Sequence, residues 1–210
     1  MGTDLKAWTS CSTPYGRTAL TTTYLNLNQY TKMNTKIYLG VDCGKSGAIS
    51  EIDNAGNLIE FHAMPIVGKG KGSKLDLQKL AEYFSYKKLA IENGRDYMVI
   101  VEDPGGHAPS AAGLRSMTYC FAAIETLLVA YKLKHHIVLS QKWQREFWSK
   151  PQMPKGQKFD TKAAALAEAK KLWPDEHFRV TSEAGNLLKN PHDGIVDAAL
   201  LATYGMRKRI

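Results

Sequence analysis

The sequence predicts an α/β domain with a mixed five-stranded sheet flanked by helices. Two apolar runs that each end in a carboxylate, at Asp42 and at Glu102, are typical of buried strands. Short turns join the first run to two further strand-like segments, and helical patterns separate the later strands. With 210 residues, the chain is long enough for one domain with a substantial core.

The individual elements follow from local patterns in chain order. Turn residues at 53–56 connect strands into an antiparallel meander, and the strands that end at Glu102 and near Leu139 are expected to extend it on the Asp42 side. Ser140 and Asp160 or Thr161 can cap helices, and Pro174 ends one. The expected strands are 36–42, 47–52, 57–63, 97–101 and 137–139, and the expected helices are 75–91, 110–132, a short one from 140, 162–173 and 192–206.

Residues 1–34 differ from the rest of the chain. They are rich in Thr and Ser and show little apolar periodicity, so we expect a flexible N-terminal extension before a domain at 35–210. Three widely spaced cysteines form neither a disulfide framework nor a zinc pattern, which favours a reducing compartment. No apolar run is long enough to span a bilayer, so we expect no membrane partner.

The basic balance of the chain favours an anionic partner. The formal net charge is +8 and the sequence pI is about 9.3, which points to nucleic acid first and to a membrane surface second. A Gly/Lys run at 68–74 is either a solvated loop or a phosphate-contacting loop. Lysines on loops or at a helix start are the candidates for DNA contacts: Lys69, Lys71, Lys74, Lys155, Lys158 and Lys162.

Four acidic residues are the candidate site. Asp42 and Glu102 would lie side by side if their strands are neighbours, and Asp193 and Asp197 share one face of a mostly apolar helix. Like charges at this spacing repel, and a bound cation explains them; a solvated face, or Asp193 acting only as a cap, is the alternative. Oxygen ligands suit Mg²⁺, for which Mn²⁺ can substitute, and such ions promote phosphodiester cleavage.

These residues resemble the motifs of a known family, the RuvC-type Holliday junction resolvases, especially phage-like or organellar forms. The resemblance covers residues 36–206. Residues 40–48 resemble the first motif, and Val101 and Glu102 before a Gly/Pro loop resemble the second. Residues 192–201 resemble the last motif, and Trp143 and the segments 161–163 and 172–174 are similar to the intervening parts.

The resemblance implies a ribonuclease H-like fold, a homodimer and Mg²⁺-dependent resolution of four-way DNA junctions by two symmetric nicks. It gives the metal-ligand roles to the four carboxylates, and it places Lys162 where the family carries a basic residue near the scissile phosphate. It also implies the cytoplasm of a bacterial or phage-infected cell, with an organelle left open. The sequence departs from the family pattern at Cys43, where many relatives have proline, and in the four-residue spacing of Asp193 and Asp197. Asp103 could replace Glu102 as a ligand.

Two other classes of enzyme share parts of this pattern. A ribonuclease H-like nuclease that acts on RNA or on other branched DNA fits the same carboxylates. A sugar- or acetate-kinase-like ATPase shares the strand–Asp–Gly opening but normally needs a second, similar domain, for which this chain is too short. Cleavage assays with Mg²⁺ and several nucleic acids distinguish these classes.

Overall fold

Five strands form one mixed sheet in the order β3-β2-β1-β6-β7. The computed structural model describes residues 36–68, 70–105, 110–154, 156, 158–181 and 185–210, so the expected extension at 1–34 lies outside the described residues. The first three strands pair antiparallel, and β6 and β7 continue the sheet parallel to β1. The strands are β1 (Lys36–Asp42), β2 (Ala48–Asp53), β3 (Leu58–Ala63), β6 (Asp96–Asp103) and β7 (His135–Leu139).

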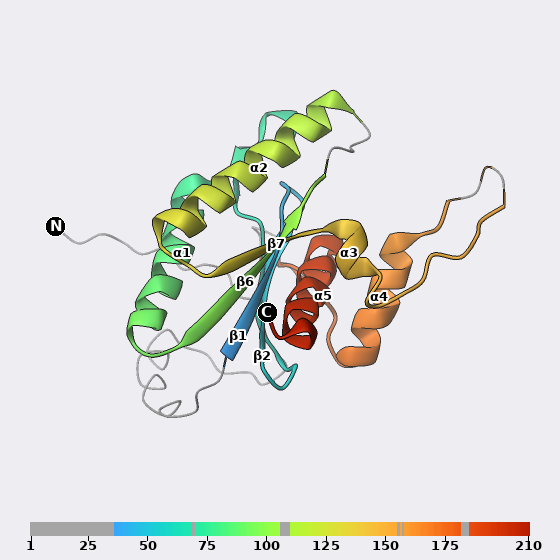
Figure 1. Cartoon of the computed structure of the whole chain (residues 1–210). Coiled ribbons are helices and arrows are strands. Elements are labelled where there is room, and N and C mark those ends of the chain that lie inside the picture. Colours follow the sequence, from blue (N-terminus) through green and yellow to red (C-terminus); the bar gives the residue numbers. More distant parts are fainter. Residues whose placement is uncertain (1–35, 69, 106–109, 155, 157, 182–184) are drawn as a thin grey trace.

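Helices cover both faces of this sheet, as Figure 1 shows. Helices α1 (Leu77–Glu92) and α2 (Ala111–Ala130) lie on one face. Helix α5 (Asp193–Lys208) packs on the other face, with α4 (Thr161–Leu172) outside it and the short α3 (Ser140–Gln144) after β7. The predicted fold class, a mixed five-stranded sheet flanked by helices, is therefore confirmed, with the expected element ends within three residues of those observed.

The segment between β3 and α1 holds structure that the sequence did not predict. A two-stranded ribbon of β4 (Ile66–Val67) and β5 (Lys74–Leu75) encloses a 3₁₀ turn at Gly70–Gly72. No helix in the described residues is long and apolar enough to cross a membrane.

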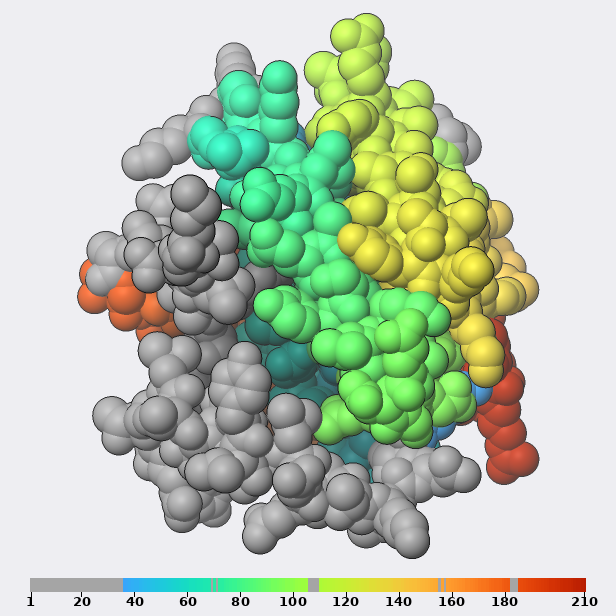
Figure 2. Space-filling model, turned by 90° about the vertical axis from the view of Figure 1, so that its left-hand side faces the viewer, coloured from blue at the N-terminus to red at the C-terminus, as the bar shows by residue number. Residues whose placement is uncertain are grey.

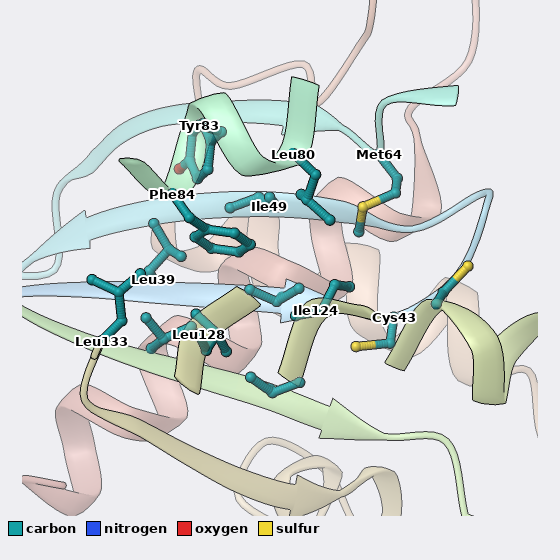
Figure 3. Packing of buried hydrophobic residues seen from close by; sticks show 14 of the residues in the cluster. Leu39, Cys43, Ile49, Met64, Leu80, Tyr83, Phe84, Ile124, Leu128 and Leu133 are labelled. Carbon is teal, nitrogen blue, oxygen red and sulfur yellow. The ribbon is translucent and has the colours of Figure 1, made fainter. Parts of the chain in front are cut away.

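A large apolar core lies between the sheet and the pair α1 and α2 (Figure 3). Leu39 from β1, Phe84 from α1 and Leu128 from α2 are all fully buried there. Figure 2 shows α1 and α2 side by side over this face, as green and yellow ridges. Ile124 and Leu128 on the inner side of α2 are part of this core, so neither is open to contact with a second copy of the chain.

Helix α5 is the element that the second core surrounds. Most of its residues are buried, because the sheet covers one side and α4 covers the other. The helix lies directly on β1 at Gly40, where an added Cβ would lie 1.9 Å from the Ala198 carbonyl oxygen. A residue larger than glycine would therefore push α5 away from the strand that carries Asp42.

Candidate active site

The parallel pairing of β1 and β6 places two predicted site residues level with each other. Val41 pairs with Val101, so Asp42 and Glu102 follow on neighbouring strands at the same edge of the sheet. Adjacent strands are about 4.8 Å apart, which brings both carboxylates to one place. The sequence analysis expected this placement if the two strands were neighbours, and β1 and β6 are adjacent in the sheet.

The start of α5 is fixed against the same edge. The Ser50 hydroxyl on β2 donates a hydrogen bond to the Ile195 carbonyl at 3.1 Å. A Cβ on Gly194 would lie 2.6 Å from the Ser46 carbonyl oxygen, so the helix begins in direct contact with the turn after β1. The His192 side chain caps α5 by accepting from the Ile195 amide at 3.3 Å, and Asp193 is the first helical residue rather than the cap.

Three of the four predicted carboxylates are largely shielded from solvent and act on one another through their charges. Burial raises the pKa of Asp42 well above its usual value, and the charges of Glu102 and Asp197 raise it further. Burial, followed by the charges of Glu102 and Asp193, raises the pKa of Asp197 to about 7. The structure thus brings Asp42, Glu102 and Asp197 together as a like-charged group, called here the acidic triad.

Two side chains hold Glu102 that the sequence did not identify as its partners. The Ser140 hydroxyl donates to one carboxylate oxygen, and the Trp143 indole donates to the other at 3.1 Å. Burial raises the pKa of Glu102, although both hydrogen bonds oppose this shift. The register of β6 with β7, where Glu102 pairs with Val138, is the signal that places Ser140 nearby. Asp103 is occupied differently, because it accepts from the Gly105 amide at 2.8 Å in a turn.

Asp193 differs from the acidic triad in its surroundings. It is exposed, and it forms an ion pair with Lys162 at the start of α4. The hydrogen bond from Lys162 to Asp193, and the charge of Asp193, raise the pKa of Lys162. The structure therefore places both residues beside the triad but pairs them with each other.

The donor set of the triad fits a hard divalent cation. All of its ligand atoms are carboxylate oxygens, and a cation would remove the repulsion that raises their pKa values. Within the described residues, no three His, Cys, Asp or Glu side chains form a ready-made metal-binding group. Both oxygens of Glu102 accept hydrogen bonds and keep lone pairs for a metal, whereas Asp193 is paired with Lys162 and would bind a metal only after that ion pair opens.

The predicted DNA-contacting lysines are only partly described. Lys74, Lys158 and Lys162 are exposed, whereas Lys69 and Lys155 and the side chain of Lys71 lie outside the described part of the chain. Lys45, in the turn after β1, donates to the Ser73 carbonyl at 3.1 Å. This contact holds the Gly/Lys segment next to the turn that follows Asp42.

Comparison with known proteins shows no family for this chain. No protein-family model and no curated protein matches the sequence. The chain is similar in structure to Thermus thermophilus RuvC in complex with a Holliday junction substrate, with a TM-score of 0.48, 9% identity, and coverage of 82% of this chain and 96% of that one. Another structure of Thermus thermophilus RuvC gives a TM-score of 0.42 at 10% identity, covering 82% of this chain and 96% of that one.

A more distant likeness is to the ethanolamine utilization protein EutJ from Carboxydothermus hydrogenoformans. The TM-score is 0.31 at 14% identity, and the match covers 51% of this chain and 38% of that one. None of these likenesses bears on activity. The strand order and strand directions place the chain in the ribonuclease H-like fold class, and its candidate active site is the acidic triad at the sheet edge.

Proposed function

We propose that this protein is a metal-dependent endonuclease that resolves four-way DNA junctions. The observation that carries the proposal is the acidic triad, in which burial and like charges raise the pKa values of Asp42 and Asp197 although the charge of Lys162 opposes these shifts. Such a group is costly in a folded protein unless a metal ion uses it. The motif resemblance to junction resolvases and the net charge of +8 support a DNA substrate.

The roles of the chain's own residues follow from their contacts. Asp42, Glu102 and Asp197 would hold Mg²⁺ or Mn²⁺, and Asp193 would join them after its ion pair with Lys162 opens. The metal would supply the charge that activates water and stabilises the leaving oxygen. Ser140 and Trp143 orient Glu102, and Lys162, once free of Asp193, would contact the phosphate.

The proposal includes a homodimer, because two symmetric nicks in a junction need two active sites related by a two-fold axis. The contact surface cannot rest on Ile124 and Leu128, which are buried in the core. Exposed apolar side chains that remain on the α1 and α2 face include Tyr86, Leu89, Tyr119 and Val129. Light scattering tests this assembly, and a monomer at working concentrations would contradict it.

A cleavage assay tests the proposed function. The protein is incubated with Mg²⁺ and a labelled four-way junction, a linear duplex or an RNA–DNA hybrid. We expect paired nicks at symmetric positions in the junction and little cutting of the linear duplex. Cutting of the hybrid alone would favour the RNA nuclease, and cutting of none of the three would refute a nuclease.

A further inference from the structure

A cavity with polar and cationic side chains in its wall lies behind the short helix whose Ser140 and Trp143 contact Glu102. Its volume is about 480 Å³, within the ~300–1,000 Å³ range of small-molecule sites. The lining side chains carry two amides, an indole, a hydroxyl and two cations, and none of them is acidic. They are Gln141, Gln144, Arg145, Trp148, Ser149 and Lys150.

The cavity and the acidic triad are connected by two faces of one helical segment. Backbone hydrogen bonds continue the helical turns of α3 as far as Trp148, whose amide donates to the Gln144 carbonyl at 3.1 Å. Ser140 and Trp143 contact Glu102 on one face. Residues 141, 144, 145 and 148 follow the i, i+3, i+4, i+7 spacing of a second face, and all four line the cavity.

The charges of Arg145 and Lys150 in the cavity wall are not neutralised by the acidic residue that is nearest in sequence, Glu146. Glu146 lies between Arg145 and Phe147, but it forms an ion pair with Lys208 at 2.6 Å. Neither Arg145 nor Lys150 forms an ion pair within the described residues. An anionic group is the natural ligand for two cations that have no ion-pair partner among the residues described.

Trp148 adds an indole whose N–H group lacks a hydrogen-bond partner in the ranges that the structure describes. Its N–H is buried and has no acceptor within the described part of the protein. The ring packs edge-on against Trp143 with centroids 5.8 Å apart, so it connects the cavity wall to the indole that contacts Glu102. Glutamine amides and an aromatic ring are the groups with which proteins bind nucleobases.

We propose that this cavity holds one nucleotide of the DNA strand, next to the phosphate that is cleaved. Arg145 and Lys150 contact its phosphate, and Gln141, Gln144 and Trp148 contact its base. Gln141 directly follows Ser140, and the helical turns continue for about 12 Å as far as Trp148, so the cavity begins beside the residues that contact Glu102 and extends roughly three to four nucleotide steps from it. This inference rests on the proposed function and gives the site a base preference beside the cut.

Binding measurements in EDTA test the cavity without requiring cleavage. Arg145→Ala should weaken binding of a fluorescein-labelled four-way junction about tenfold, because it removes a charged contact. Lys142→Ala is the matched control, since it removes one exposed charge from the same helix without lining the cavity. Its affinity should stay within about twofold of the native protein. Equal effects of the two substitutions would overturn the proposal.

A second measurement distinguishes a base from a phosphate in the cavity. Junctions that each carry one abasic site, at successive positions within six nucleotides of the crossover, are compared with the intact junction. The native protein should lose affinity at one position, and the Gln141→Ala/Gln144→Ala double variant should be insensitive there. If no position mattered, the cavity would hold phosphate alone and the proposed base contact would be wrong.

These results separate the two proposals. A protein that cut none of the nucleic acids but kept its position-specific loss with abasic junctions would fail the proposed function while supporting the cavity. A protein that resolved junctions but bound every abasic junction equally would support the proposed function and contradict the base contact in the cavity. The variants should keep the unfolding midpoint of the native protein, because most of the altered side chains are exposed. Unchanged midpoints would exclude a loss of fold as the cause of weaker binding.

Discussion

Two groups of carboxylates lie at this sheet, and they differ in whether a lysine of the protein contacts them directly. The acidic triad joins three carboxylates, and the nearby Lys162 is exposed and paired with Asp193. On the other face, Glu51 from β2 and Glu60 from β3 share the ammonium group of Lys87 from α1. Tyr83 also donates a hydrogen bond to Glu51, and Lys87 lies 4.7 Å from the centroid of the Tyr83 ring.

The second group is a structural ion cluster. Burial lowers the pKa of Lys87, but Glu51 and Glu60 outweigh it and leave the pKa raised. Burial raises the pKa of Glu51 to about 7, while Lys87 opposes that shift. Each of these charges has a partner of opposite sign within the protein. Burial of carboxylates therefore does not by itself mark a site. Lys87 forms ion pairs with both Glu51 and Glu60, whereas the Lys162 ammonium pairs with Asp193 and lowers the pKa values of Asp42 and Asp197 only in part.

The largest expected effect concerns the triad. Asp42→Asn should reduce junction cleavage by roughly a thousandfold or more, because it removes a charge that holds the metal. Junction binding should stay equal or become tighter, and the free energy of unfolding in EDTA should not fall, since repulsion is relieved. Gel assays, anisotropy and urea denaturation measure the three quantities.

The matched control is Asp53→Asn, which makes the same chemical change at the end of β2, within a turn. It should leave cleavage unchanged. Wild-type cleavage by Asp42→Asn would remove the basis of the catalytic assignment, and unfolding of that variant would make Asp42 a structural residue.

The opposite result is expected for the structural cluster. Lys87→Met should lower the free energy of unfolding by about 3–5 kcal/mol, because Glu51 would stay buried without its cation. Lys88→Met, which alters a surface pair with Glu92, should cost less than about 1 kcal/mol. Adding Glu51→Gln to Lys87→Met should restore part of the loss. Similar stabilities for the two single lysine variants would contradict the structural assignment.

A smaller effect should appear in the pH dependence of stability without metal. The pKa of Asp197 is about 7 in the folded protein, above the usual aspartate value, so the folded state binds more protons between these pH values. The stability that Asp197 contributes is therefore fully present near pH 4 and lost as the pH rises to 7. In EDTA, the free energy of unfolding of the native protein should fall by about 1–3 kcal/mol more between pH 4 and pH 7 than that of Asp197→Asn. Urea denaturation at the two pH values measures this difference.

With saturating Mg²⁺, the native protein should instead be more stable than Asp197→Asn at pH 7, since the ion stabilises only a folded protein with ionised carboxylates. Cleavage by the native protein should also fall below pH 7, as protons compete with the metal. Parallel pH profiles for the native protein and Asp197→Asn in EDTA would show that Asp197 does not belong to the triad.

The smallest expected change in stability is at Lys162. Lys162→Ala should alter the free energy of unfolding by less than about 1 kcal/mol, because its pair with Asp193 is exposed. Cleavage should nevertheless fall about tenfold, since a contact to the phosphate is lost. Lys170→Ala, an exposed lysine of the same helix, serves as the control. Equal cleavage by both variants would exclude Lys162 from the site.

The sequence alone was sufficient to place the sheet, its strand order on the Asp42 side, and the adjacency of Asp42 and Glu102. These follow from local patterns, because apolar runs and turn residues define the strands, and carboxylates at the ends of neighbouring parallel strands meet at one edge. The position of Asp197 was also predictable, since helical spacing and an apolar helix direct it inward.

Only the tertiary structure decided which charges are paired. Lys162 and Asp193 are 31 residues apart, and Lys87 reaches Glu51 across a different layer, so no local pattern joins them. The burial of Glu51 was not foreseen because a charged residue in a strand normally faces solvent. Ser140 and Trp143 likewise contact Glu102 only after β7 pairs with β6. Pairing over long sequence separation depends on packing, and packing is what separated the structural carboxylates from those proposed to bind metal.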